Sequence, residues 1–316
     1  FISDEFKGNI EWDISKLNTI TIDIETECAN GFPDPKTAIE PLLCVTVKSH
    51  STKEIIVFGI GEYKNDNDKV TYHQFPTEQS LLEAFIKFWS DYDPDIVTGW
   101  NCKFFDMPYL INRINYLLGE SESLKLSPWG VVEGKKQSKQ FGGEIEHYDI
   151  LGVSTLDYLD LYKKYTYTKL ESYRLNFVAG VELGDFKDEN PYDSFKEWYT
   201  KDYQSFVDYN IQDVELVDQL EDKMKLIELH LTMAYEAKVN FQEVFQQVTM
   251  WDAIIFNFLK DKGIVVPQKI DHEGARGYEG AYVKDPIVGF HDWVVSYDLN
   301  SLYPHLIMQY NISPET

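Results

Sequence analysis

The stretch Thr-Ile-Asp-Ile-Glu-Thr, residues 21–26, alternates apolar and polar side chains, which is typical of a β-strand with one buried face. Because alternate residues of a strand point to the same face, Asp23 and Glu25 project together, opposite Ile22 and Ile24. Two like charges side by side repel, and a half-buried strand seldom keeps such a pair without a cation. Carboxylate oxygens are preferred ligands of Mg²⁺ and Mn²⁺. We therefore expect a divalent metal site on this face of the strand.

The composition is that of a long and acidic chain. Its 316 residues suffice for a sizeable core and more than one domain. The 29 Lys and Arg and the 53 Asp and Glu give a net charge of −24, which argues against a non-specific nucleic-acid coat. The charge does not exclude a nuclease, because bound metals can carry the positive charge that faces the phosphates.

The number and spacing of the cysteines and the hydropathy of the chain indicate the cellular compartment of the protein. Cys28, Cys44 and Cys102 form neither a CxxC pair nor an even set, which argues against a disulfide framework or a zinc site. We find no apolar run of membrane-spanning length and no signal peptide, so we expect no membrane partner and a cytoplasmic location. The chain begins without Met and stops without an obvious finish, and we expect it to be a fragment of a longer protein.

The order of the elements after the first strand indicates an α/β fold. Residues 42–47 and 54–60 are predicted to be strands, and residues 95–98 a short one. Between them, Thr77 can cap a helix whose apolar residues recur at helical spacing up to Trp89. We therefore expect a mixed sheet flanked by helices.

Three segments outside the first strand carry candidate site residues. Phe32 lies in a turn-rich loop, where it either folds back onto the core or offers a base a stacking platform, and from the loop alone we favour the first. Asp106 begins a predicted helix that ends near Gly119, and on this stretch alone we interpret it as an N-cap. The pattern of residues 129–149 predicts a β-hairpin. Its Lys135 and Lys136 could contact phosphates or could simply be solvent-exposed residues of the hairpin loop.

The second half of the chain is predicted to be mainly helical. We expect a short helix over 170–179, a long helical pattern from about 198 to 237 and a second block around 251–259. Tyr209 and Asp213 are four residues apart, so within this helical pattern they lie on one face, one turn from each other. A later strand over 294–299 is expected to carry Asp298.

These pieces form one ordered set: Asp-x-Glu on a strand, an Asp at the start of a helix, and Tyr-x-x-x-Asp on a later helix. Four carboxylates can hold two divalent metals ~3.5–4 Å apart, the arrangement used for phosphodiester cleavage. One metal would activate the attacking water, and the other would stabilise the leaving 3′ oxygen. Tyr209 could orient the water through its hydroxyl.

At these residues the chain resembles the family B DNA polymerases, with the exonuclease motifs of the DEDD class in its tyrosine form. The matching blocks are Asp23-Ile24-Glu25, Gly99-Trp100-Asn101 with Phe105-Asp106-x-Pro108-Tyr109, and Tyr209-Asn210-x-x-Asp213. Two later blocks, Tyr278-x-Gly280-Ala281 and Asp298 to Pro304, resemble the family's linker and its first polymerase motif. The details are most similar to replicative polymerases of T-even-like bacteriophages.

The resemblance implies an RNase H-like fold and 3′→5′ proofreading by a DNA-directed DNA polymerase. It further implies a division of the chain into a lead-in at 1–19, an exonuclease domain at 20–225, a helical segment at 226–269 that packs with the amino-terminal domain, and the start of a palm at 270–316.

The resemblance also implies roles for the exonuclease residues. Asp23 would bridge two ions, Mg²⁺ or Mn²⁺, with Glu25 and Asp213 on the water-activating one and Asp106 on the other. The implied DNA-binding residues are the base-stacking Phe32, the supporting Asn101, and Lys135 and Lys136 of the strand-separating hairpin.

For the full-length protein, the resemblance implies that Asp298 is a metal ligand of the polymerase site. Leu302 and Tyr303 would contact the incoming nucleotide, with Tyr303 rejecting a ribose 2′-OH. The family's later polymerase motifs are absent from this sequence, so we expect no template-directed synthesis by it. The implied partners are primer-template or single-stranded DNA and, for the full-length protein, a sliding clamp and a single-strand-binding protein. The implied location is the host cytoplasm.

Two other interpretations stay open at this point. A stand-alone DEDD nuclease could act on RNA, which a comparison of RNA and DNA oligonucleotides would reveal. Alternatively, the acids could cap helices and pair with lysines in an inactive binding module, which would bind no Mn²⁺.

Overall fold

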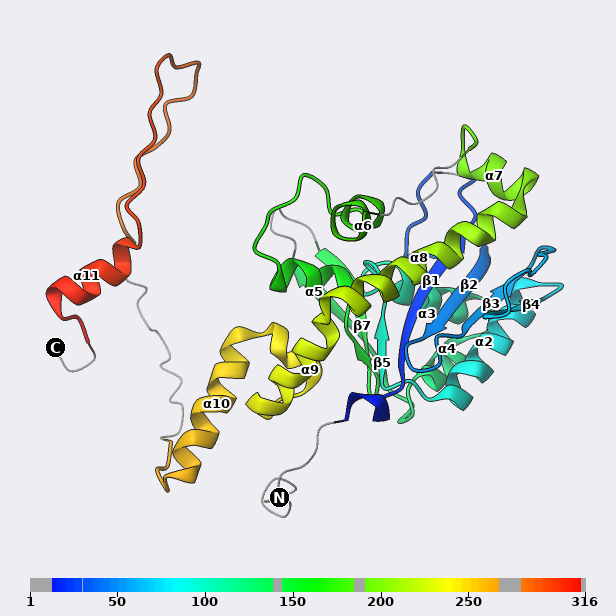
Figure 1. Ribbon diagram of the computed structural model, residues 1–316, viewed down its shortest axis with the longest axis horizontal. Helices are drawn as coiled ribbons and strands as arrows, with labels where there is room; N and C mark the ends of the chain where they lie inside the picture. Colours follow the sequence, from blue (N-terminus) through cyan, green and yellow to red (C-terminus); the bar gives the residue numbers. More distant parts are fainter. Residues whose placement is uncertain (1–12, 30, 139–143, 185–190, 267–279, 314–316) are drawn as a thin grey trace. The chain divides into compact units, whose positions relative to one another are not determined.

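The computed structural model describes residues 13–29, 31–138, 144–184, 191–266 and 280–313 (Figure 1). The chain divides into two compact units, residues 1–266 and 267–316. Among the described helices, none combines the length and the apolar character needed to span a lipid bilayer.

The first unit is built on a six-stranded mixed sheet with the strand order β4-β3-β2-β1-β5-β8. The central strand β1 pairs antiparallel with β2 and parallel with β5. Strand β3 is antiparallel to β2 and parallel to β4, and β8 is parallel to β5, so β2 alone runs against the others. The strands are β1 (Thr19–Thr26), β2 (Leu42–Ser49), β3 (Ile55–Gly59), β4 (Val70–Gln74), β5 (Ile96–Thr98) and β8 (Ser154–Thr155).

Helices cover both faces of the sheet, which confirms the mixed sheet flanked by helices. Ile20, Ile22 and Ile24 of β1 pack on one face in a core shared with α2 (Glu78–Tyr92) and α3 (Asp106–Leu117). On the other face, α7 (Phe195–Lys201) and α8 (Tyr203–Met224) share a second core with β2 and β3. Figure 1 shows α8 crossing in front of β1 and β2. Asp23 and Glu25 lie on the face that α8 covers, because their carboxylates approach that of Asp213 on α8.

Local signals predicted some elements correctly and missed others. The Thr77 hydroxyl accepts a hydrogen bond from the backbone N–H of Ser80 at 3.2 Å, as a cap of α2 should. The expected strands at 42–47, 54–60 and 95–98 are β2, β3 and β5. Strands β4 and β8 were not predicted, because β4 is a largely exposed edge strand and β8 has two residues.

The long helical pattern expected from about 198 to 237 is helical, but it is divided into three helices. It comprises α7, α8 and α9 (Leu226–Ala237). Asp202 ends α7 and caps α8 by accepting the backbone N–H of Ser205 at 3.1 Å. Lys225 separates α8 from α9 with a left-handed φ of 54°. Both breaks are made by single residues, which leave the helical spacing of apolar residues nearly unchanged.

The remaining elements of this unit include the expected hairpin, β6 (Val132–Ser138) with β7 (Glu144–Ile150), whose tip lies outside the described residues. The helix expected over 170–179 begins later, at α6 (Leu175–Leu183). The block expected around 251–259 is α10 (Gln247–Asp261). The shorter elements are η1 (Ile14–Lys16), α4 (Glu120–Ser123), η2 (Leu124–Leu126), α5 (Tyr158–Tyr165) and η3 (Phe241–Phe245).

The second unit holds α11 (Leu302–Tyr310), and the strand expected over 294–299 does not form. Among residues 280–313, no second strand pairs with this segment, and its residues are exposed. An apolar alternation alone cannot make a strand, because the backbone groups need a neighbouring strand as hydrogen-bond partner. Asp298 consequently lies in a segment without regular secondary structure.

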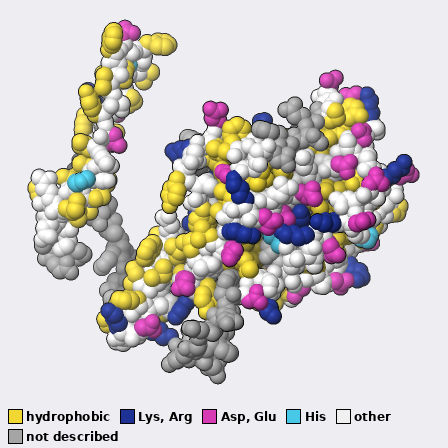
Figure 2. All heavy atoms as spheres, viewed as in Figure 1, with side chains coloured by type: hydrophobic (Ala, Val, Ile, Leu, Met, Phe, Trp, Pro, Cys, Tyr) yellow, Lys and Arg dark blue, Asp and Glu magenta, His cyan; other side chains and the backbone are white. Residues whose placement is uncertain are grey.

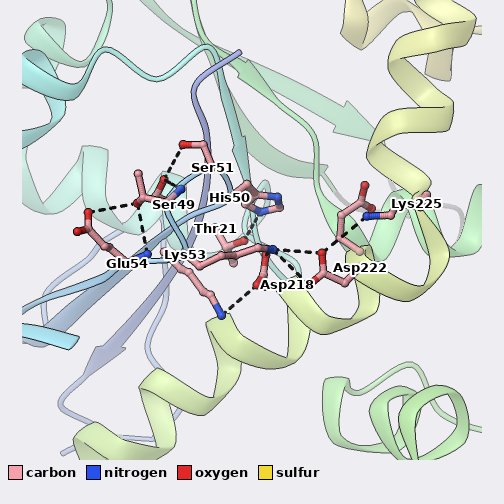
Figure 3. Close-up of polar contacts among 12 residues, drawn as sticks. Thr21, Ser49, His50, Ser51, Lys53, Glu54, Asp218, Asp222 and Lys225 are labelled. Atoms are coloured by element: carbon pink, nitrogen blue, oxygen red, sulfur yellow. Dashed lines mark hydrogen bonds and ion pairs between the residues drawn. The ribbon is translucent and has the colours of Figure 1, made fainter. Parts of the chain in front are cut away.

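An ion-pair network centred on the buried Asp218 fixes α8 to β2 and to the β2–β3 turn. Asp218 of α8 is 3% exposed and pairs with Lys48 of β2 at 3.0 Å and with Lys53 at 2.7 Å. Lys53 also pairs with Asp222, one turn further along α8, at 3.1 Å (Figure 3). Burial opposes the ionisation of Asp218, but the two lysines outweigh it and lower its pKa. The network therefore sets where α8 lies on the sheet.

Candidate active site

A cavity of about 900 Å³ opens over the carboxyl end of β1. Its walls come from β1, from the loop around Phe32 and from the segment Trp100 to Asp106. The starts of α6 and α7 and the first half of α8 complete them. The candidate residues Asp23, Glu25, Asp106, Tyr209 and Asp213 all line it. Segments that are far apart in the sequence thus line one cavity, because the order of strands in the sheet places them side by side.

Three carboxylates form a compact group in this cavity. Asp23 and Glu25 of β1 and Asp213 of α8 each offer one oxygen atom, and these oxygens lie within 4.8 Å of one another. Each of the three side chains is partly buried. Carboxylates this close repel unless a cation neutralises them, and all-oxygen ligands suit a hard divalent ion. The residues present therefore fit a divalent metal.

Asp106 lines the same cavity but does not belong to the three-carboxylate group. It is the first residue of α3 and is 3% exposed. The interpretation of Asp106 as an N-cap was wrong, since its Oδ1 accepts the backbone N–H of Ile24 on β1 at 3.1 Å. Burial raises the pKa of Asp106 to about 8, and the charges of Asp157 and Asp213 add to the shift. A nearby cation would favour its ionised form.

The segment before α3 is held by a buried aspartate, Asp157, at the start of α5. Asp157 caps α5 and also accepts the backbone N–H groups of Asn101 at 3.0 Å and Lys103 at 2.9 Å. Asn101 adopts a left-handed φ of 66°, lines the cavity and makes its hydrogen bonds through its backbone. Gly99 passes so close to β1 that a Cβ atom would lie 2.5 Å from the carbonyl oxygen of Ile22. These contacts determine where Asp106 enters the site.

Tyr209 lies one turn before Asp213 on α8, inside an aromatic cluster. Its ring centroid is 4.9 Å from Trp198 and 6.2 Å from Phe195, both of α7. Burial raises the pKa of Tyr209, and the charges of Asp213, Glu25 and Asp23 raise it further. The phenol therefore keeps its proton at neutral pH and can donate a hydrogen bond.

The loop around Phe32 presents this side chain to the cavity rather than to the core. Phe32 is 85% exposed and lines the cavity, with its ring centroid 5.3 Å from that of Phe105. Of the two readings of Phe32, folding back onto the core is the one that the structure contradicts. An exposed aromatic ring beside a second ring is suited to stacking.

The lysines of the hairpin lie elsewhere. Lys135 pairs with Glu133 at 2.6 Å, and Lys136 lies 3.6 Å from Glu144, all on the exposed surface of β6 and β7. Neither lysine lines the cavity. Exposed pairs of this kind contribute little energy, so both lysines can exchange partners.

The polymerase-type candidates Asp298, Leu302 and Tyr303 belong to the second unit. All three are exposed, and Leu302 and Tyr303 form the first turn of α11.

Sequence reasoning assigned no role to Asn210, which the structure places inside the site. This residue of α8 is fully buried, and its Nδ2 donates a hydrogen bond to Oδ2 of Asp23 at 2.5 Å. Its Oδ1 accepts from the hydroxyl of Thr46 on β2. Arg174 and Lys196, which line the cavity, were also missed. The sequence did contain a signal for Asn210, since it is a polar residue next to Tyr209 on a helix with an apolar face. No sequence pattern pointed to Arg174 or Lys196.

Comparison with known proteins assigns the family. Residues 2–178 match the DNA polymerase family B exonuclease domain, and residues 239–316 match DNA polymerase family B. The chain therefore belongs to the family B DNA polymerases.

Similar proteins include the DNA-directed DNA polymerases of Escherichia phage RB69 and Enterobacteria phage T4. Both are 36% identical over the whole chain, which covers 37% and 38% of their lengths. The DNA polymerase delta catalytic subunit of Drosophila melanogaster is 28% identical over 99% of the chain and 30% of its own length. The chain thus spans less than two fifths of these relatives.

The buried acid Asp106 predicts a pH dependence of the metal-free protein. Its folded pKa of about 8 exceeds the usual 3.8, so the folded state holds a proton that the unfolded state has released between these pH values. The free energy of unfolding should therefore fall as the pH rises through this window. The Asp106→Asn variant cannot ionise at this position. The difference in free energy of unfolding, variant minus wild type, should therefore increase by more than about 1.4 kcal/mol between about pH 5 and 8.5, an amount that corresponds to a shift of one pKa unit.

Urea unfolding in EDTA measures this difference, with the exposed Asp68→Asn as control. Taking the variant-minus-wild-type difference removes the contribution of His50 and His230. Burial lowers the pKa of both to about 4, so they reduce stability only as the pH falls below 6.5. A difference that does not change with pH would contradict the prediction.

Proposed function

We propose that this chain is the 3′→5′ proofreading exonuclease portion of a phage-type, family B DNA-directed DNA polymerase. The observation that carries the proposal is the carboxylate group of Asp23, Glu25 and Asp213, with buried Asp106 and protonated Tyr209 lining the same cavity. The substrate is the 3′ end of single-stranded or frayed primer DNA, and the cofactors are two Mg²⁺ or Mn²⁺ ions.

The reaction is hydrolysis of the terminal phosphodiester. A water oxygen bonds to phosphorus, the bond from phosphorus to the 3′ oxygen of the preceding nucleotide breaks, and that oxygen takes up a proton. When bound, the metal ions supply Lewis-acid activation of water and charge stabilisation at the leaving oxygen. In this proposal, Asp23, Glu25 and Asp213 would hold the ion that activates water, and Asp23 and Asp106 would hold the other.

The other side chains of the cavity bind and orient the DNA. Tyr209 keeps its proton and donates a hydrogen bond to the attacking water or to the scissile phosphate. Phe32 stacks on the terminal base, and Arg174 and Lys196 supply positive charge for the phosphates. Asn101 shapes the cavity through its backbone, and Lys135 and Lys136 contact DNA on the hairpin.

Synthesis belongs to the longer protein in this proposal, with Asp298 as a metal ligand and Leu302 and Tyr303 at the incoming nucleotide. We also propose the domain limits given above, with residues 226–269 packing against an amino-terminal domain. In support, hydrophobic side chains gather along α10 in Figure 2, where Trp251 and Phe256 are more than half exposed. A sliding clamp and a single-strand-binding protein are the proposed partners, in the cytoplasm of the phage's host.

The test is digestion of a 5′-labelled single-stranded DNA oligonucleotide with Mg²⁺. We expect a ladder that shortens from the 3′ end and disappears with EDTA or in Asp23→Ala/Glu25→Ala. A matched RNA oligonucleotide distinguishes an RNA nuclease, and Mn²⁺ calorimetry distinguishes an inactive module. Intact DNA in the presence of Mg²⁺ would contradict the proposal.

The role of Phe32 gives a separate prediction. Phe32→Ala removes the exposed ring, and base stacking is worth ~1–3 kcal/mol, so we expect affinity for single-stranded DNA to fall roughly 5- to 150-fold. Fluorescence anisotropy in an Asp213→Asn background, which preserves the DNA, measures the change. Tyr167→Ala is the control, because Tyr167 is fully exposed and does not line the cavity. Equal losses in both variants would refute a stacking role.

A further inference from the structure

We propose that Asn210 is a positioning residue that holds the carboxylate of Asp23 in the orientation needed to bind metal. The inference rests on the proposed function, since it assigns Asp23 as a metal ligand. It concerns a residue that binds neither metal nor substrate itself, and it is carried by the hydrogen bonds that Asn210 makes with β1 and β2.

The chemistry of the three groups fixes the direction of each hydrogen bond. An ionised carboxylate can only accept, so the group facing Asp23 must be the NH₂ of the Asn210 amide. The amide oxygen then faces Thr46, whose hydroxyl must donate to it. The thiol of Cys44 lies 3.6 Å from the same oxygen and adds a weak donor. The amide thus has one allowed orientation.

The backbone places these groups in register. Thr46 lies directly opposite Asp23 in the β1–β2 ladder, so both side chains leave the sheet on the same face. The side chain of Asn210, on α8, forms hydrogen bonds with both members of this cross-strand pair. Its side chain is fully buried, which excludes water as a competing donor or acceptor.

The arrangement leaves Asp23 able to bind cations. The amide occupies one acceptor site of Oδ2, whereas a carboxylate has about four such sites. Because the side-chain rotation of Asp23 is restrained in advance, less conformational entropy remains to be lost on metal binding. The amide oxygen is engaged by Thr46, so Asn210 does not act as a ligand.

The experiment compares Mn²⁺ affinity by calorimetry in the wild type, Asn210→Leu and Thr46→Val. Residues that orient a metal ligand typically change affinity ~10–100-fold, and we expect a loss in that range for Asn210→Leu. Thr46→Val removes only the hydroxyl that fixes the amide, and we expect a smaller loss, of roughly 3–10-fold. Urea unfolding in EDTA, recorded in parallel, reports folding separately from metal binding.

Asn112→Leu is the matched control. Asn112 on α3 bonds to the carbonyl of Pro35 and to the hydroxyl of Tyr148, away from the carboxylates, and its loss should leave Mn²⁺ affinity unchanged. Wild-type Mn²⁺ affinity in folded Asn210→Leu, or in Thr46→Val should Asn210→Leu not fold, would overturn the inference. A wild type that binds no Mn²⁺ would overturn the proposed function instead.

Discussion

Asp213→Asn is expected to lower the rate of 3′-end digestion by more than about 100-fold, because even residues that only orient a metal ligand contribute ~10–100-fold. The substitution keeps the shape of the side chain and removes one of three neighbouring negative charges. Metal affinity should fall with the rate. The metal-free protein should become more stable, since the repulsion with Asp23 and Glu25 is relieved.

The opposite signs of these effects make the experiment decisive. A misfolded variant would lose both activity and stability, whereas loss of a metal ligand lowers activity while stability in EDTA rises. Asp208→Asn is the control, because Asp208 lies on the same helix but bonds to the hydroxyl of Tyr63 outside the cavity. Digestion by Asp213→Asn within tenfold of the wild type would exclude Asp213 as a metal ligand.

Asp218→Ala is expected to lower the free energy of unfolding by about 3–5 kcal/mol, the usual cost of breaking a buried ion pair from one side. The substitution leaves the ammonium group of Lys48 buried without its carboxylate. The stabilisation by Asp218 is present at neutral pH and is lost in acid. The reason is that its lowered pKa makes the folded state release its proton more readily than the unfolded state.

Urea unfolding in EDTA measures the effect, and two further variants define its cause. Asp222→Ala removes an exposed partner of Lys53 and of Lys225 and should cost less than about 1 kcal/mol. Lys48→Met combined with Asp218→Leu replaces both buried charges by apolar groups and should recover most of the lost stability. Equal losses in Asp218→Ala and Asp222→Ala would contradict the special position of Asp218.

Much of the site is predictable from local sequence, because strands and helices have short periods. The period of two places Asp23 and Glu25 on one face of β1, and the spacing of four places Tyr209 and Asp213 on one face of α8. The helix start at Thr77 and the β6–β7 hairpin likewise depend on neighbours in the chain. The family resemblance then supplied roles that spacing alone leaves open.

Only the tertiary structure determined the contacts between segments that are far apart in the chain. The hydrogen bond from Ile24 to Asp106 joins residues 82 positions apart, and it replaces the capping role that the local stretch suggested. The bond from Asn210 to Asp23 joins residues 187 positions apart, and no local pattern encodes it. The strand expected at 294–299 failed for the same reason, because a strand exists only with a partner that its own residues cannot specify. Local periodicity sets which face a side chain occupies, whereas the packing of α8 across β1 and β2 determines which side chains meet there.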